Sequence, residues 1–482
     1  MDNNTDTKTK AALATDRIAT IDALRGLAIF GMILCAYIGW QSGLPAWMFH
    51  AQLPPPDYVF SPETRGITWV DLVFPFFLFS MGAAFPFALR KRAEKGMGTG
   101  RICLSLVKRW AILACFSIIL GNAGASSSSD AAPLWKNLFM IFTWAGLFLA
   151  LVRIRSGKAW KAAVTNAAGI IMLVAAAFIL RYGLDVPLSK DRCDAIIMIL
   201  AYVSVAGSLI WLATRDCLAA RLCIFLAIAA VKALDSYTGI LSFIPDAGEA
   251  GYGWIFKFEY LQYLLIAIPG SVAGDLILRR KHAQTLDEAP RSTSNTIAAV
   301  LAGAAVVLQL WGLFTRHVAE DLVLTLLLSA GAACLALLQG GRKAAPKPET
   351  WSVIMLTGLA LMTAGIIFDP IDGGIRKDWC NLSYLLTTGG MAGATAGIFM
   401  FLETKAGVKM SWLCRCGQNP MLAYTVTGYF IIPVLSIAGL AQLMFRASEG
   451  SQVMGLVQGF VFTALMMAVT IFFTDRKIFW RS

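Results

Sequence analysis

The chain has 482 residues, of which 57% are hydrophobic and only 15% are charged, and its mean hydropathy is +0.67. This composition excludes an assembly of soluble domains, because such domains need a larger charged surface to face water. The net charge of +12 could indicate a nucleic-acid partner. The placement of the basic residues explains it better, and we expect no nucleic acid.

Up to fourteen apolar stretches of roughly 17 to 25 residues are long enough to cross about 30 Å of hydrocarbon. Strands of a membrane barrel would be about half as long, so the sequence predicts an all-α, polytopic transmembrane helix bundle of about 11–14 spans. We expect a tail at residues 1–18 and a single transmembrane domain at 19–482, with a first outer loop at 41–66 and a helix pair at 295–340. The approximate centres of the stretches are Met32, Phe79, Cys115, Leu147, Met172, Ala201, Ala227, Ile268, Val307, Leu326, Leu359, Ala394, Ile432 and Met466.

The basic residues predict the orientation of the bundle. If the N-terminus is cytoplasmic and all fourteen stretches span, most of the 41 Lys and Arg lie on the inner side, as in Arg90 to Arg92 and Arg279 to Lys281. Both termini are then cytoplasmic. The first 17 residues are polar and lack a cleavage site of small residues, which favours a retained first helix. We expect a multi-pass protein of the cell inner membrane that contacts the lipid bilayer directly.

The ten cysteines show no C-x-x-C spacing and no disulfide framework. Cys193 and Cys380 fall in predicted outer loops and could form a pair, which the sequence leaves open. The histidines at positions 50, 282 and 317 lie in different loops, without the clustered Cys, Asp or Glu spacing of a zinc site. We therefore assign no metal.

The first outer loop contains the most unusual set of residues in the chain. It carries Trp47, His50, Asp57 and three consecutive prolines, 54 to 56, which stiffen the chain into an extended path. An imidazole exchanges a proton near neutral pH, and loops held by rigid helices often carry function. His50 is therefore a candidate catalytic residue, although an interfacial histidine that bonds a carbonyl or a lipid headgroup is the alternative.

Asp71 has two interpretations. Thr68-x-x-Asp71 precedes an apolar run, which is the pattern of a capping box at the start of the second span. A carboxylate near the outer surface could also orient the His50 imidazole and stabilise its protonated form. The two roles can coexist.

Several motifs occur together in one order along the chain. Ile21 to Gly26 reads I-D-A-L-R-G, Gly66 to Pro75 reads G-I-T-W-V-D-L-V-F-P, and His50 lies between them. These motifs resemble the heparan-α-glucosaminide N-acetyltransferase family, and the L-R-G opening is shared with a wider group of transmembrane acyltransferases. Further correspondences are Arg109, Pro269-Gly270 with Gly274, Pro370 with Ser383-Tyr384, and Gly417-x-Asn419 with Tyr424. The chain departs from the family pattern at Met140 to Trp144, which lacks an arginine, and at Thr427, where the family has a histidine.

The resemblance implies a membrane-embedded acetyltransferase. Members of that family take acetyl from cytoplasmic acetyl-CoA and place it on the amino group of a terminal glucosamine across the membrane. The family's essential histidine carries over to His50, which could act as a general base or be acetylated itself, and the sequence leaves both routes open. The alternatives are a glycolipid or sugar transporter or flippase, and an O-acetyltransferase of an envelope glycan. A homodimer is one alternative for the oligomeric state.

Four further residues are candidates for CoA binding under this resemblance. Asp22 and Arg25 share one helix face at the inner end of the first span, where they could also be an N-cap and a positive-inside anchor. Arg25 and Arg109 suit phosphate groups because a guanidinium forms two parallel hydrogen bonds. Asn419 precedes Pro420, which is typical of an N-cap and first helical residue, and the family match adds a pore-lining alternative.

Overall fold

The structure is a computed structural model that describes the chain except residues 1–18, 155–158, 239–256, 284–291, 338–348 and 481–482. The expected N-terminal tail, 1–18, lies outside the described residues. The first half of the bundle contains α2 (Ala19–Tyr37), α3 (Val73–Glu94), α4 (Thr99–Gly124), α5 (Pro133–Leu151), α6 (Ala159–Phe178), α7 (Ala195–Thr214), α8 (Leu218–Thr238) and α9 (Leu264–Ala283). The second half contains α10 (Thr293–Thr315), α11 (Val318–Leu337), α12 (Thr350–Phe368), α13 (Leu382–Thr404), α14 (Ser411–Gly417), α15 (Pro420–Val426), α16 (Ile432–Ile437), α17 (Leu440–Ser448) and α18 (Gln452–Asp475).

The all-α prediction is confirmed. Each of the fourteen predicted centres lies in a helix, and thirteen segments of the described chain are long and apolar enough to cross a membrane. One such segment, Pro420–Ile437, is made of α15, a π-helical turn (Thr427–Ile431) and α16. A short antiparallel ribbon was not predicted: β1 (Val152–Ile154) pairs with β2 (Ile478–Trp480).

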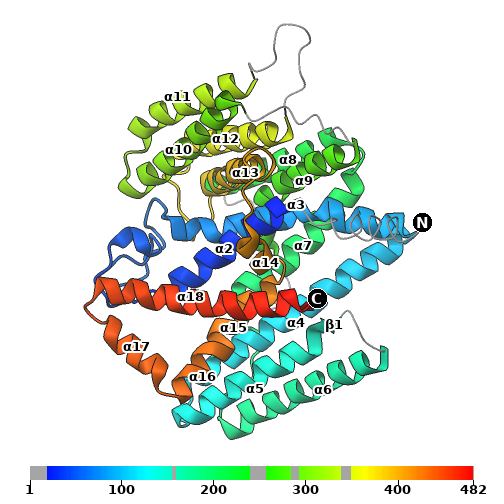
Figure 1. The fold of residues 1–482 in the computed structure, drawn as a ribbon, viewed down its shortest axis with the longest axis vertical. Coiled ribbons are helices and arrows are strands. Elements are labelled where there is room, and N and C mark those ends of the chain that lie inside the picture. The colour runs from blue at the N-terminus through cyan, green and yellow to red at the C-terminus, as the bar shows by residue number, and fades with distance from the viewer. Residues whose placement is uncertain (1–18, 155–158, 239–256, 284–291, 338–348, 481–482) are drawn as a thin grey trace, which may run out of the picture.

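Helix α3 lies at the centre of the bundle and packs on α2, α4, α7, α9 and α13. Figure 1 shows α3 crossing between α9–α13 on one side and α5, α6 and α18 on the other. The hairpins α5–α6 and α10–α11 lie at the periphery. In α6 and α11, only 17% of the residues of the apolar stretch are buried inside the protein. Their exposed apolar side chains are what a lipid-facing surface requires.

Glycines allow α3 and α9 to approach closely. A Cβ added to Gly82 would lie 2.1 Å from the carbonyl oxygen of Ala267, and one on Gly270 would lie 2.2 Å from that of Phe79. A Cβ added to Gly274 would lie 2.3 Å from the carbonyl oxygen of Ala83. Small residues spaced by four on a membrane helix permit such backbone contact, which replaces hydrophobic burial as the source of helix association in lipid.

Helix α8 falls outside the thirteen apolar segments, since it contains Arg221, Lys232 and Asp235. The chain nevertheless has to cross between α7 and α9. The segment before α9 lies beside the first half of α7, where the Lys257 amide donates to the Tyr202 hydroxyl at 3.4 Å. Since α7 ends at the opposite end, at Thr214, α8 connects the two ends of the bundle.

A buried ion pair fixes α8 in this position. The guanidinium of Arg221, whose side chain is 1% exposed, lies 2.6 Å from the Asp275 carboxylate on α9. Thr214 and Ser271 accept further hydrogen bonds from Arg221, and the Trp211 indole donates to Asp275 at 3.1 Å. Every polar group of the pair therefore has partners, as a charge in a membrane protein interior requires.

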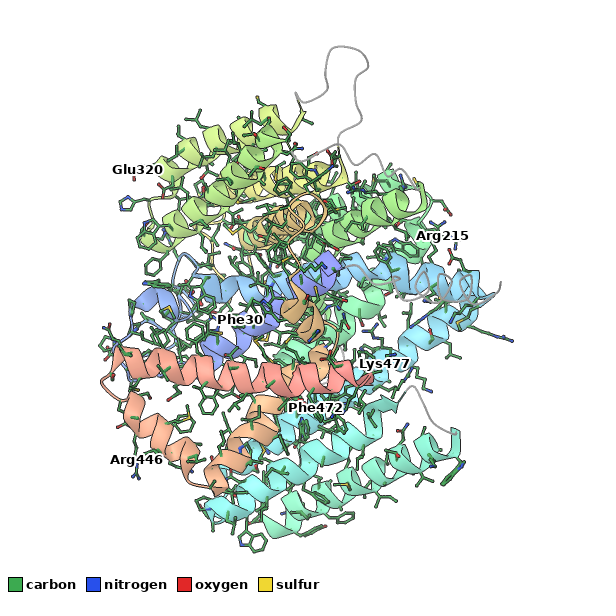
Figure 2. All side chains as sticks on the ribbon, viewed as in Figure 1. Phe30, Arg215, Glu320, Arg446, Phe472 and Lys477 are labelled. Atoms are coloured by element: carbon green, nitrogen blue, oxygen red, sulfur yellow. The ribbon has the colours of Figure 1, made fainter. Side chains whose placement is uncertain are left out.

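The first and last spans share both faces of the bundle. The start of α2 and the end of α18 both contact the segment around α14, through Cys414 to the Ala19 carbonyl and Arg415 to Asp475. The end of α2 meets the start of α18, where the Gly39 amide donates to the Gly455 carbonyl at 3.1 Å. The described parts of the first and last spans thus begin and end on the same face. Figure 2 places Arg215 at the opposite end of the bundle from Glu320 and Arg446.

Candidate active site

The first outer loop is held against the end of α2 by aromatic contacts. The rings of Trp40, Phe49 and Tyr58 form a triangle with centroids 5.1 to 5.3 Å apart. Phe49 is 1% exposed, and its carbonyl accepts a hydrogen bond of 2.7 Å from the Thr68 hydroxyl. The residue that follows, His50, is thereby held beside the start of the second span.

His50 and Asp71 lie in direct contact. The imidazole Nδ1 of His50 is 2.6 Å from Asp71 Oδ1, and the Ala51 amide donates to Asp71 Oδ2 at 3.3 Å. The Asp71 side chain is fully buried, whereas that of His50 is 28% exposed. A buried carboxylate bonded to Nδ1 orients the ring and leaves Nε2 for another partner.

The predicted capping box is confirmed at the same residues. The Thr68 amide donates to Asp71 Oδ2 at 3.0 Å, and the Thr68 hydroxyl accepts from the Val70 amide at 3.3 Å. One carboxylate oxygen of Asp71 thus serves the cap, while the other contacts His50. The structural role and the position beside the imidazole coexist.

A third charged residue, which was not predicted from the sequence, completes this cluster. Lys377 Nζ lies 2.9 Å from His50 Nδ1 and 3.3 Å from Asp71 Oδ1. It comes from the segment between α12 and α13, 327 residues from His50. A signal was present in the sequence, because Lys377 lies shortly before the Ser383-Tyr384 pair that matched the family pattern.

The segment that carries Lys377 is fixed on the first outer loop. The Gly66 amide donates to the Ile375 carbonyl at 2.8 Å, and Arg376 forms an ion pair of 2.7 Å with Glu63. The Tyr384 hydroxyl donates to the backbone carbonyl of Asp71 at 3.0 Å. Three separate parts of the chain therefore build the site.

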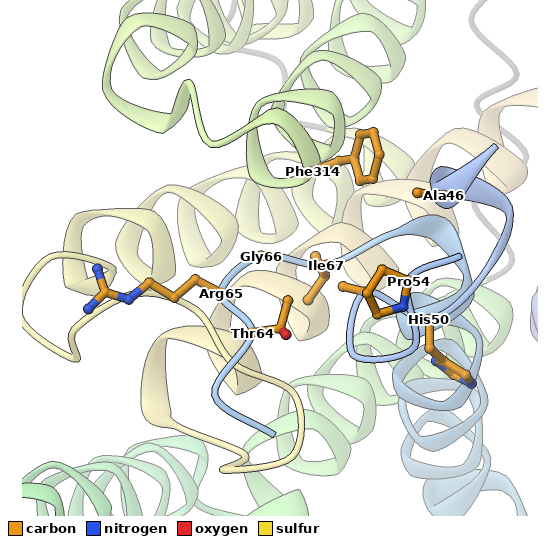
Figure 3. A pocket seen from close by; sticks show the side chains of 9 residues that line it. Ala46, His50, Pro54, Thr64, Arg65, Gly66, Ile67 and Phe314 are labelled. Atoms are coloured by element: carbon orange, nitrogen blue, oxygen red, sulfur yellow. The ribbon is translucent and has the colours of Figure 1, made fainter. Parts of the chain in front are cut away.

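A small pocket opens beside His50. Its volume is about 100 Å³, and its lining includes His50, Pro54, Arg65 and Phe314. Figure 3 shows His50 and Pro54 at one end of the pocket, with Arg65 extending away at the other.

Arginines gather toward the inner half of the bundle. Arg25 on α2 donates to Asp22 at 3.3 Å, to the Gly417 carbonyl at 3.2 Å and to the Ser80 carbonyl at 3.3 Å. The positive charges of Arg25 and of Arg92 at the end of α3 act on Arg109 of α4. Within the described part of the chain, the buried Nε of Arg109 has no hydrogen-bond partner. Like charges brought together in this way favour binding of an anion.

Asn419 differs from both sequence interpretations. It precedes Pro420 at the start of α15 as expected, but its side chain makes no capping hydrogen bond. Its amide instead donates to the Ile478 carbonyl and accepts from the Trp480 amide, both at 3.0 Å. It is 1% exposed, so the amide fastens β2 rather than lining a pore. The unpredicted ribbon explains the difference.

The cysteines at 193 and 380 are both free, so the open alternative of a disulfide is not realised. Burial raises the pKa of the Cys380 thiol to about 12, because the thiolate would lie away from water. Partial burial also raises the pKa of the Asp378 carboxyl, which lies within range of the charges of Lys377, Asp71 and His50.

Comparison with known proteins identifies the family. Residues 17–277, more than half of the chain, match the family described as "Domain of unknown function (DUF5009)". The chain belongs to this DUF5009 family. The matched range includes His50, Asp71, Arg25 and Arg109 and excludes Lys377.

A curated relative of the DUF5009 chain is human heparan-alpha-glucosaminide N-acetyltransferase (Homo sapiens). The two are 29% identical over 107 residues, which is 22% of this chain and 14% of the human protein. The chain thus aligns with a small part of that relative's length. The similarity is distant and partial, and it agrees with the family that the motifs resemble.

Proposed function

We propose that this protein is an acetyltransferase of the inner membrane that moves acetyl from cytoplasmic acetyl-CoA to the amino group of an amino sugar, such as a terminal glucosamine, outside. The observation that carries the proposal is the pairing of His50 with Asp71 beside a pocket, at the opposite end of α2 from the arginines. The distant similarity to a named N-acetyltransferase supports it.

The length of α2 gives the approximate separation between the arginines and the His50–Asp71 pair. Cys35, near the outer end of α2, lies within range of the charges of Asp71 and Lys377, while Arg25 lies ten residues earlier. Ten helical residues rise about 15 Å. The pantetheine arm of CoA has roughly the length of four to five extended residues, which is also about 15 Å. Phosphates near the arginines would therefore allow the thioester to reach toward His50.

The arginine group fits the anionic part of CoA. Phosphates accept paired hydrogen bonds from guanidinium groups, and the buried Arg109 Nε is a donor that lacks a partner in the described chain. Arg92 adds a third positive charge and is held by Ser105 at 2.8 Å. We assign Arg25, Arg92 and Arg109 to phosphate binding, with Asp22 positioning Arg25.

The outer site supplies the proton chemistry. With Nδ1–H donating to Asp71, Nε2 of His50 keeps its lone pair and can accept a proton from the attacking amine. The amine nitrogen then forms a bond to the thioester carbonyl carbon, the carbon–sulfur bond breaks, and the proton passes from Nε2 to the CoA thiolate. A route through acetyl-histidine would use the same nitrogen.

The proposal is tested with purified protein in proteoliposomes that contain acetyl-CoA and glucosamine. His50→Ala should lower the rate of acetylglucosamine formation at least about 100-fold, the usual contribution of a positioned acid–base group. His317→Ala is the matched control, because His317 also contacts a carboxylate, Glu320, at 2.7 Å. Full activity of the His50 variant would remove the site assignment.

A sugar carrier, the leading alternative, is separated by ligand binding. A protein that binds CoA should melt at a higher temperature in its presence, by the linkage between binding and folding. A carrier that has no CoA site should show no such rise. Absence of both the shift and acetyl transfer would contradict the proposed function.

A further inference from the structure

We infer that Lys377 is a positioning residue that offsets the charge of Asp71 beside His50 and so opposes protonation of the imidazole. Its importance for catalysis rests on the proposed function, whereas its effect on the protonation of His50 does not. One ring nitrogen, His50 Nδ1, lies in contact with both charged partners, Asp71 and Lys377.

Nδ1 can donate a hydrogen bond to Asp71 or accept one from Lys377, but it cannot do both at once. An ammonium is a donor without an acceptor site, so Lys377 can bond Nδ1 only if that nitrogen carries no proton. The contact with Asp71 is shorter, 2.6 Å against 2.9 Å, and it joins the imidazole to a charged acceptor. The Nδ1 proton therefore lies toward Asp71. Lys377 is then held mainly by Asp71 Oδ1 at 3.3 Å and places its charge against the ring.

Lys377 opposes an effect that Asp71 alone would have on His50. A fully buried carboxylate in contact with an imidazole favours the imidazolium, which has no lone pair with which to take a proton. The Lys377 ammonium offsets the carboxylate charge and opposes a second positive charge on the ring.

Other charged or titratable groups near the ring are few in the described structure. Asp378 lies within range of His50, and Arg65 lines the same pocket. Cys35 of α2 lies within range of the Asp71 charge, and the Tyr384 hydroxyl of α13 donates to the Asp71 carbonyl. Thiols and phenols ordinarily carry no charge near pH 7. Lys377 is the basic group in contact with both His50 and Asp71, so its removal should dominate any change in protonation.

Lys377 is also held in place by its surroundings. The residues directly before it are fixed by the Ile375 carbonyl to Gly66 and by the Arg376 ion pair with Glu63. Its side chain is only 28% exposed, unlike that of a freely solvated lysine. A fixed ammonium acts on the ring continuously, which a mobile surface charge does not.

The test measures the protonation of His50 directly. Protein labelled with ¹³C at histidine gives NMR signals from three histidines, and His50→Gln identifies the relevant one. In Lys377→Met, the pH midpoint of the His50 signal should rise by about one unit, the usual effect of removing a neighbouring charge. Lys377→Arg should keep the wild-type midpoint. Lys136→Met, at a lysine that bonds the Ser127 carbonyl, is the matched control.

Two readouts separate this inference from the proposed function. An unchanged midpoint in folded Lys377→Met overturns the inference, whether or not the wild-type protein transfers acetyl. A raised midpoint supports it even if acetyl transfer is absent, in which case the proposed function fails alone. If transfer occurs, the acidic limb of the plot of acetyl-transfer rate against pH should move to higher pH in Lys377→Met, by the same amount as the midpoint of the His50 signal. A limb that stays in place contradicts the role of Lys377 in catalysis. Thermal melting of each variant establishes that it is folded.

Discussion

His50 Nδ1 lies 2.6 Å from Asp71 Oδ1, although 21 residues and a proline-rich loop separate the two in sequence. The contact depends on the capping box, because the Thr68 amide holds the other oxygen of the same carboxylate at 3.0 Å. The start of a membrane helix is therefore also the element that orients the imidazole.

Asp71→Asn should separate these two roles. The amide oxygen can still accept from the Thr68 amide, so we expect the variant to fold. The loss of charge beside the ring, and the freedom of the amide to donate, should lower acetyl transfer about 100-fold or more. Rates are compared with Asp57→Asn, which changes an exposed carboxyl of the same loop. Equal rates in the two variants would contradict the role given to Asp71.

Arg109→Met should weaken CoA binding about tenfold or more, since it removes charged hydrogen-bond donors. Titration of the CoA-dependent rise in melting temperature measures the affinity. Lys108→Met, at the neighbouring exposed residue, removes an equal charge and should change the affinity little. Similar losses in both variants would show that the bound phosphates respond to general charge rather than to Arg109.

Arg221→Met should destabilise the protein by about 3–5 kcal/mol, because it leaves the Asp275 carboxylate buried without its partner. Thermal unfolding in detergent is the measurement. The double variant Arg221→Met with Asp275→Leu should recover most of the loss, and Arg215→Met, in an exposed pair with Asp216, should have little effect. A double variant no more stable than the single one would argue against a mainly electrostatic cause.

Gly270→Ala should destabilise the contact between α3 and α9. The new Cβ would lie 2.2 Å from the Phe79 carbonyl oxygen, so the helices must separate, at a cost of about 1–3 kcal/mol. Gly303→Ala is the control, because the nearest atom to its Cβ would be 3.9 Å away. Melting temperatures that fall equally in both variants would rule out the close approach as the reason.

Asp194→Asn should make stability less dependent on pH. Burial raises the pKa of the Asp194 carboxyl, so its charged form is less favourable in the folded protein than in the unfolded chain. This cost is complete above the folded pKa, shrinks as the pH falls below it, and is gone once the pH is below the pKa of the unfolded chain. Asparagine keeps one acceptor oxygen, for the Ile197 amide, and its NH2 group can donate to the Tyr424 hydroxyl in place of the bond that this hydroxyl donates to Asp194. The variant should melt higher than wild type at pH 7 and similarly near pH 4; equal melting at both values would contradict the assignment.

The helices were predictable because spanning lengths and apolar composition are properties of single segments. Helix α8 was predicted around Ala227 as well, but the sequence did not show what neutralises its Arg221, because the partner Asp275 belongs to another helix. Asn419 shows the same limit for function. Its local pattern is that of an N-cap, but its amide is used by β2, about 60 residues further along.

The candidate site also contains residues that a local motif predicts and residues that only the packing brings together. His50 and Asp71 could be selected because each belongs to a short motif, and the capping pattern placed Asp71 at a helix start. Lys377 could not be joined to them, because the contact forms only when the segment before α13 packs on the first outer loop. Arg92 lies within range of Arg109 because α3 packs on α4, and no local sequence pattern specifies that packing.

Acetyl transfer across a bilayer tests the central claim most directly. Protein is inserted into proteoliposomes in a known orientation, with acetyl-CoA confined to the arginine face and glucosamine confined to the His50 face. We predict that acetylglucosamine forms on the His50 face, and that His50→Ala abolishes it while His317→Ala does not. Product that forms only when both substrates share one compartment, or no product in folded protein, would contradict transfer through the bundle.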